Sequence, residues 1–200
     1  MDVRKAIYKR RSVRSFKQKP LDQQVLRELI DAARVGPSAA NRQPLQYVVV
    51  TEPGLCQQVF DCLKWAAYTA PRGVPQPGFT PTAYVAICVK KDLALAVGAK
   101  YDLGAAAQTI LLLATAQGLG TCWIKTMDAP RLSQILAVPE GVELDSVVAL
   151  GLPAEEPEQV DLEPGQEGLE AIKYWRDDKD QQFVPKRNLA DILFWNKYSG

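Results

Sequence analysis

The sequence predicts an α+β domain organised around one buried helix. That helix lies in Tyr101–Thr126, where apolar residues leave almost no polar face, and a helix of this kind is expected to be buried. Gly118 ends it, because glycine adopts the left-handed cap conformation at little cost, and Cys122–Ile124 follows as a short buried strand. Apolar and β-branched residues predict three further strands, at Gln46–Val50, Ala83–Val89 and Asp145–Leu150.

Helical spacing of apolar residues predicts four more helices. Asp22 and Asp128 precede two of them as N-caps, and Gly36 ends the first of these two. Tyr68–Thr82 contains so many prolines and glycines that we expect a long surface loop there. The predicted helices are Asp2–Arg10, Asp22–Gly36, Leu55–Ala66 and Pro130–Leu136.

Length and charge exclude several classes of protein. The 200 residues suit one domain with its own core. Gln108 interrupts the apolar run, which is in any case shorter than the roughly 20 residues of a bilayer span, so we expect no membrane anchor. The net charge of +1 gives no reason to expect a nucleic-acid or membrane-surface partner.

Cysteine and histidine usage limits the possible chemistry. The four cysteines form no Cys-x-x-Cys pair and show no metal-ligand spacing, and no apolar signal segment opens the chain, so we expect a reduced, cytoplasmic protein without a metal site. The sequence contains no histidine, which rules out a Ser-His-Asp triad and a Cys-His pair. An enzyme with this composition would depend on carboxylates or on an organic cofactor.

Two polar segments are candidate binding sites. Lys9–Phe16, the basic turn, carries four cations within six residues together with Ser12, and guanidinium groups and a hydroxyl match phosphate oxygens. Its spacing alone does not decide between a phosphate site and a solvated basic segment. Pro37–Pro44 is a stiff loop of small residues that another surface could approach closely, although taken alone it favours an ordinary helix-to-strand connection.

The composition changes after Pro153. Residues 154–170 are acidic and rich in proline and glycine, and they predict an extended surface segment. The remainder, to Tyr198, contains several aromatic residues that need cover, either from the body of the chain or from a second copy.

Four blocks of residues, taken together and in this order, resemble the FMN-dependent nitroreductase family. They cover most of the first 155 residues, and glycine-rich phosphate motifs of the Rossmann and P-loop kinds are absent. The blocks are Arg10-Arg11-Ser12-Val13-Arg14-Ser15-Phe16, Pro37-Ser38-Ala39-Ala40-Asn41-Arg42-Gln43-Pro44, Gly118-Leu119-Gly120-Thr121-Cys122-Trp123-Ile124 and Ala149-Leu150-Gly151-Leu152-Pro153.

The resemblance implies a fold, an assembly and an activity. The fold is a three-layer α/β/α sandwich with a central mixed, mainly antiparallel sheet around the buried core helix. Residues 1–153 would form the FMN-binding core, and residues 154–200 a C-terminal arm of the same domain that wraps a homodimer partner. The activity is hydride transfer from NADH or NADPH to flavin N5 and on to a nitroaromatic, quinone or similar small-molecule acceptor by alternating (ping-pong) binding.

The resemblance also places residues around the flavin. Arg10 and Ser12 would contact the phosphate and ribityl chain, with Arg11 beside them. Arg14 would lie at the pyrimidine edge, where a cation stabilises the charge that develops on reduction. The other implied contacts are Pro37, Ser38 and Ala39 from the partner subunit, Asn41 and Gln43 bracing their loop, Trp123, Ile124 and Lys125 on the strand past flavin N5, and Lys186 and Arg187 closing on the phosphate.

Two departures and several alternatives remain open. The acidic insertion moves the late basic pair to Lys186-Arg187, and Leu45 stands where many members have tryptophan. A flavin carrier without turnover, or another redox branch of the fold (flavin destruction, dehalogenation or dehydrogenation), fits the same blocks. The sequence identifies neither the acceptor nor the preferred nicotinamide cofactor.

Overall fold

The computed structural model describes residues 1–95 and 97–198, so the last two residues of the expected C-terminal arm lie outside it. The chain forms two compact units. The first comprises Met1–Trp65 and Pro75–Glu155, and the second comprises Ala66–Val74 and the chain from Glu156 onward. The expected boundary after residue 153, with one domain overall, stays a prediction.

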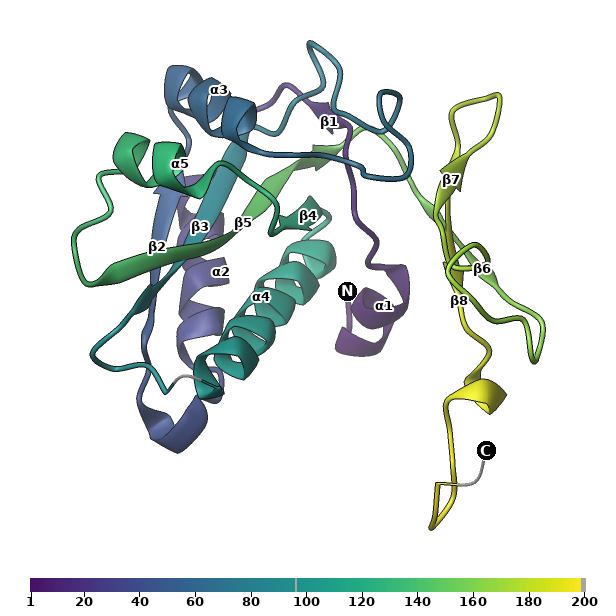
Figure 1. Ribbon diagram of the computed structural model, residues 1–200. Coiled ribbons are helices and arrows are strands. Elements are labelled where there is room, and N and C mark those ends of the chain that lie inside the picture. Colours follow the sequence, from purple (N-terminus) through teal and green to yellow (C-terminus); the bar gives the residue numbers. More distant parts are fainter. Residues whose placement is uncertain (96, 199–200) are drawn as a thin grey trace. The chain divides into compact units, whose positions relative to one another are not determined.

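The first unit is built on a five-stranded sheet (Figure 1). The central strand β5 pairs with β3 along one side and with β4 and β1 along the other, and β2 lies at the far edge beyond β3. These strand pairs are all antiparallel, and an isolated parallel bridge joins Ser12 to Thr121 outside the named strands. The strands are β1 (Phe16–Lys17), β2 (Leu45–Val50), β3 (Ala83–Lys90), β4 (Gly120–Ile124) and β5 (Val142–Pro153).

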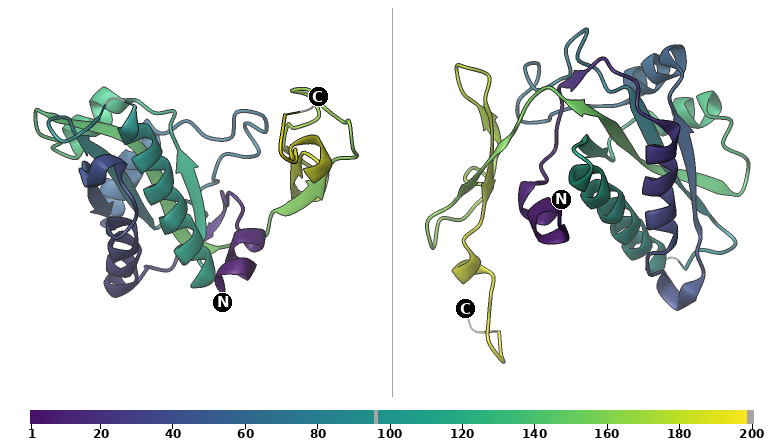
Figure 2. Two further views of the ribbon diagram at one scale, coloured as in Figure 1. Left: turned by 90° about the horizontal axis from the view of Figure 1, so that it is seen from below. Right: turned by 180° about the vertical axis from the view of Figure 1, so that it is seen from behind.

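Helices cover both faces of this sheet, which gives the three layers that the sequence predicts (Figures 1 and 2). The helices are α1 (Val3–Lys9), α2 (Gln23–Arg34), α3 (Pro53–Cys62), α4 (Gly98–Ala116) and α5 (Ala129–Ile135), and the 3-10 helix η1 (Ala39–Asn41) lies between α2 and β2. Helices α2 and α4 pack together on one face, whereas α3 and α5 lie on the other. Asp22 and Asp128 cap α2 and α5 through their side chains, as expected.

The main core lies between the sheet and the α2–α4 pair. Alternate residues of β3, including Val85 and Ile87, face these helices, because successive side chains of a strand point to opposite faces. Ala107 and Ile110 of α4 meet them and are fully buried. Helix α4 is thus the buried core helix that the sequence predicts, although Tyr101, near its start, is 74% exposed.

Two local expectations were wrong. The helix predicted over Leu55–Ala66 begins at Pro53 and ends at Cys62, because Leu63 pairs with Met127 and Lys64 N donates to the Thr126 carbonyl at 3.0 Å. Trp123 is 43% exposed although its strand was expected to be buried, whereas Thr121, Cys122 and Ile124 of the same strand are buried. None of the helices in residues 1–95 and 97–198 is both long enough and apolar enough to cross a membrane.

The second unit contains a smaller sheet in the order β6-β8-β7. Its elements are β6 (Glu158–Asp161), β7 (Trp175–Arg176), β8 (Gln182–Lys186) and the 3-10 helix η2 (Leu189–Asp191). Trp175 stacks on Phe183 with ring centroids 5.4 Å apart, and Tyr68 packs against Tyr174 at 5.0 Å. Aromatic contacts therefore help to hold this unit together. Within the stretch 154–170, which was expected to be an extended surface segment, Glu158–Asp161 forms strand β6.

Candidate functional site

The basic turn is docked along the start of β4. After α1 ends, the backbone N–H of Val13 donates to the Thr121 carbonyl at 2.8 Å, and Ser12 forms its bridge to the same residue. Gly120 permits this approach, because a Cβ at that position would lie 2.9 Å from Val13 Cγ1 and 3.2 Å from Pro153 Cβ. The cations of the turn are therefore held against the sheet by backbone bonds.

The electrostatics of the turn favour an anion. Burial lowers the pKa of the half-buried Arg10 guanidinium, and no carboxylate of the described chain forms an ion pair with it. Burial raises the pKa of the enclosed Cys122 thiol, while the Arg14 cation and a hydrogen bond with Ser12 oppose that rise. A partly buried cation loses hydration, and an anionic ligand would compensate for that loss.

Neighbouring polar atoms fit a phosphate ester. The Thr121 hydroxyl oxygen is buried and has no hydrogen-bond partner within residues 1–95 and 97–198. Arg11 Nη1 donates to the Arg10 carbonyl, and the Arg14 backbone N–H donates to a carboxylate oxygen of Glu155. Guanidinium and hydroxyl donors gathered in the basic turn and on the start of β4 are the set that phosphate recognition uses, so these residues fit the phosphate end of FMN.

The end of β4 contributes the strand residues that the resemblance implies. Ile124 is buried and Trp123 is partly exposed, while the ammonium of Lys125 forms an ion pair with Asp145 and donates to the Asp145 carbonyl at 3.0 Å. Trp123 and Ile124 therefore lie on the strand against which the basic turn docks. The side chain of Lys125 is engaged with β5, so its backbone is the part left for a ligand.

The loop Pro37–Gln43, called the 37–43 loop, lies near the start of α4, whereas α1 and the basic turn that follows it lie near the end of that helix. Its Ala39 N–H donates to the Asp102 carboxylate at 2.8 Å, near the start of the helix, whereas the amino group of Met1 contacts the Ala116 carbonyl at 3.4 Å, at the end of α4 where α1 lies. At 1.5 Å per residue, these two points on α4 are roughly 20 Å apart. One chain therefore does not bring the 37–43 loop to the basic turn.

Inside the 37–43 loop, local bonds set the backbone. Gln43 N donates to Ser38 Oγ at 3.1 Å, and the Gln43 amide donates to the Asn41 carbonyl and side chain. Ala40, Asn41 and Gln43 all have positive φ, between 50° and 52°. Asn41 and Gln43 therefore hold the loop backbone through these bonds, and Pro37 and Ser38 line a cavity of about 130 Å³ behind it.

Lys186 and Arg187 belong to the second unit. Lys186 is exposed at the end of β8, and its carbonyl accepts a hydrogen bond from Leu162 N at 2.8 Å. Arg187 Nη2 lies 2.6 Å from Glu167 Oε1 and 3.3 Å from the Asp191 carbonyl. The guanidinium of Arg187 is therefore already paired, and a phosphate would compete with Glu167 for it.

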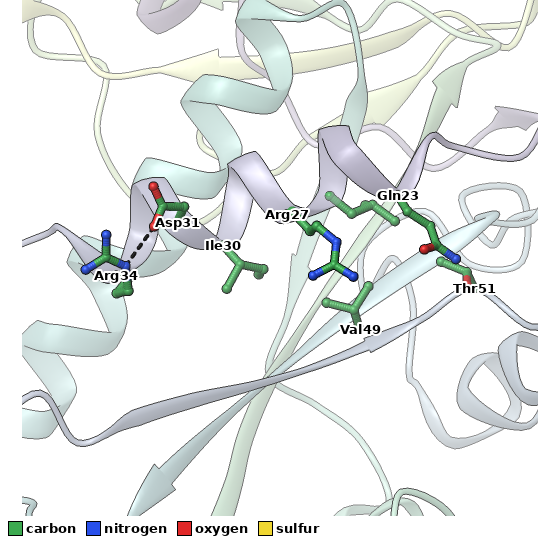
Figure 3. A pocket seen from close by; sticks show the side chains of 8 residues that line it. Gln23, Arg27, Ile30, Asp31, Arg34, Val49 and Thr51 are labelled. Atoms are coloured by element: carbon green, nitrogen blue, oxygen red, sulfur yellow. Dashed lines mark hydrogen bonds and ion pairs between the residues drawn. The ribbon is translucent and has the colours of Figure 1, made fainter.

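A separate groove of about 570 Å³ runs between α2 and β2 (Figure 3). Arg27 and Val49 face each other across it, and the Arg34–Asp31 ion pair, at 2.7 Å, lies at one end. None of the site residues predicted from the sequence lines this groove.

Three residues near the candidate site were not identified from the sequence. Asp102 carried a detectable signal, because it is an acidic residue at a buried helical position of a largely apolar helix. Thr121 sits between two residues already singled out, but nothing local shows that its hydroxyl is buried. The contact between Glu155 and the Arg14 amide joins segments 141 residues apart, which no local pattern reveals.

Comparison with known proteins agrees with this geometry. The chain belongs to the Nitroreductase family, whose model matches residues 7–152. A protein of Methanothermobacter thermautotrophicus assigned as an NADH dehydrogenase/NAD(P)H nitroreductase is 31% identical over 81% of this chain and 83% of its own length. An NADH dehydrogenase of Thermus thermophilus is 29% identical over 88% of this chain and 97% of its own length.

Solved structures show the same fold. A crystal structure described as a nitroreductase in complex with FMN, from Desulfovibrio desulfuricans, superposes with a TM-score of 0.66. The alignment covers 100% of this chain and 99% of that one at 20% identity, so the likeness concerns the fold. The prediction of a nitroreductase-like α+β sandwich is confirmed.

Proposed function

We propose that this protein is an FMN-dependent oxidoreductase that takes hydride from NADH or NADPH and passes it to a nitroaromatic, a quinone or a similar acceptor. The docking of the basic turn on β4 carries this proposal, because it gathers guanidinium and hydroxyl donors beside the strand that the flavin ring would follow. The names of the two relatives and the FMN complex of the structural neighbour support it.

Each residue of the turn has a proposed task. Arg10 and Ser12 hold the phosphate and ribityl chain, with Arg11 beside them. Arg14 places a cation at the pyrimidine edge and stabilises the negative charge that develops there on reduction. Bound FMN would supply the two-electron chemistry, and we propose that donor and acceptor bind in turn, which would give ping-pong kinetics.

We propose further that each flavin site is completed by two subunits of a homodimer. The 37–43 loop and the basic turn lie at opposite ends of α4, so a second chain is needed to bring Pro37, Ser38 and Ala39 to the flavin. Aromatic residues of the proposed C-terminal arm, residues 154–200, are exposed in one chain, Trp195 by 80%. We propose that the arm packs against the partner subunit, which covers these residues. Lys186 and Arg187 then close on the phosphate.

The proposed location is the cytoplasm, in keeping with the cysteines. All four are free and buried, and reduced thiols of this kind are typical of a reducing compartment.

Anaerobic reduction tests the activity. The purified protein is saturated with FMN, freed of excess flavin, and mixed with NADH or NADPH while the visible flavin spectrum is recorded; a nitroaromatic or a quinone is then added. We expect the flavin absorption to bleach with one of the two donors and to return with the acceptor. Flavin that binds but is not reduced would identify a carrier, and protein that remains colourless would contradict flavin binding altogether.

A further inference from the structure

The 37–43 loop has a single hydrogen-bonded attachment to another element within the described chain. Its internal bonds join Ser38, Asn41 and Gln43 to one another and to the loop backbone, so they determine shape but not placement. The attachment runs from Ala39 N–H to Asp102 Oδ1 at 2.8 Å. Asp102 lies on α4, only 5% exposed, and forms no ion pair with any residue that the structure describes.

Close packing at the same point supports this attachment. Gly98 begins α4, and a Cβ built there would lie 2.6 Å from the Cβ of Ala39. The glycine therefore lets the loop settle against the helix within reach of Asp102. The cavity of about 130 Å³ lined by Ser38, Gln43 and Asp102 leaves room for the loop to shift if the bond is lost.

The loop backbone also requires external support. Ala40, Asn41 and Gln43 occupy the left-handed region, with φ near 50°. Residues other than glycine adopt this backbone region rarely, and such conformations persist when the surrounding structure holds them. A carboxylate oxygen that accepts from an amide forms a charge-assisted bond, which is stronger than a neutral one.

We propose that Asp102 is a positioning residue that holds the 37–43 loop in the place from which one subunit presents it to the flavin of the other. The inference rests on the proposed function for its flavin part, whereas the attachment of the loop stands on the contacts above. Because Asp102 occupies the Ala39 amide, that amide is not available to the flavin, and the loop meets the ring through its other atoms.

Four variants test this role. Asp102→Ala removes the acceptor, and Asp102→Asn keeps an acceptor oxygen in the same place without the charge. Gly98→Ala displaces the loop with Asp102 intact, which keeps the test valid if Asp102→Ala fails to fold. Thr115→Val is the matched control, because Thr115 is 8% exposed on the same helix and its hydroxyl donates to the Leu111 carbonyl at 2.8 Å, away from the loop.

Limited trypsin cleavage after the exposed Arg42 reports the loop itself, and titration of the flavin-free protein with FMN reports the site. We expect Asp102→Ala and Gly98→Ala to speed the cleavage and to raise the FMN dissociation constant by roughly tenfold or more, as for the loss of a charge-assisted bond. Thr115→Val should stay within about threefold of the original protein, a range that corresponds to less than one neutral hydrogen bond. Asp102→Asn should fall between Thr115→Val and Asp102→Ala, because it keeps the bond but removes its charge.

The two readouts separate the two claims. Cleavage of Asp102→Ala at the original rate, or an Asp102→Asn variant as impaired as Asp102→Ala, would overturn the positioning role. Faster cleavage with an unchanged FMN dissociation constant would overturn its link to the flavin. If the original protein binds no FMN, the proposed function fails, and the cleavage rates still decide whether Asp102 holds the loop.

Discussion

The close contact between Gly120 and Val13 supports both the packing of the sheet and the position of the basic turn. Its missing side chain leaves space for Val13, whose backbone amide ties the basic turn to Thr121. In Gly120→Ala, the new methyl group would lie 2.9 Å from Val13 Cγ1 and 3.0 Å from Val13 Cβ. Either Val13 moves, and the bond to Thr121 lengthens, or the contact stays compressed.

The magnitude follows from two opposing effects. Overpacking of a buried contact costs about 1–3 kcal/mol. Replacing glycine by alanine also restricts the unfolded chain, which recovers about 0.4–1 kcal/mol. We therefore expect the free energy of unfolding to fall by about 1–2 kcal/mol, and the FMN dissociation constant to rise because the turn is displaced.

Urea unfolding followed by circular dichroism measures the first quantity, and flavin titration measures the second. The double variant Val13→Ala with Gly120→Ala removes Cγ1 and is the control: its loss of stability should be smaller than the sum of the two single losses, because the residues are in contact. A Gly120→Ala protein with unchanged stability and unchanged FMN affinity would refute the role of this close approach.

Three further predictions concern the flavin, the arm and the thiols. Arg14→Ala should lower the two-electron midpoint potential of bound FMN by roughly 30–60 mV, the equivalent of one charge-assisted contact; an unchanged potential in spectroelectrochemistry would remove Arg14 from that role. A chain ending at Gly165 should lose its dimer and its FMN together, since it lacks Arg187 and the exposed aromatics; a yellow, folded monomer in light scattering would contradict this. Burial raises the pKa of the Cys56 and Cys88 thiols to about 11. In the folded protein these thiols should therefore react with a thiol reagent at pH 8 far more slowly than after unfolding. Reaction at the rate of free cysteine would show that they are exposed.

Local signals in the sequence were sufficient for much of the fold. Asp22 and Asp128 precede apolar helical patterns, and both cap helices as predicted, because a cap depends on residues within one turn. The end of α3 could not be predicted in this way, since Leu63 leaves the helix to pair with Met127, far along the chain. The exposure of Trp123 likewise depends on what covers its face of the sheet, which the residues beside it in the sequence do not determine.

The candidate site divides in the same manner. The composition of the basic turn and of the 37–43 loop was visible in the sequence. Their placement was not, because it depends on bonds between distant segments, Val13 with Thr121 and Ala39 with Asp102. The first bond attaches the basic turn to β4, which follows the end of α4, and the second attaches the 37–43 loop near the start of α4. This separation is the basis for proposing sites shared by two subunits.

Hybrid dimers test the shared site most directly. One chain carries Arg10→Ala with Ser12→Ala in the basic turn, the other carries Ser38→Trp in the 37–43 loop, and different affinity tags allow the mixed dimer to be isolated. If each flavin lies between the turn of one chain and the loop of the other, the mixed dimer keeps one intact site and binds one FMN, whereas both parent variants bind none. If each site lay within one chain, every site of the mixed dimer would be damaged, and a mixed dimer without flavin would contradict the shared site.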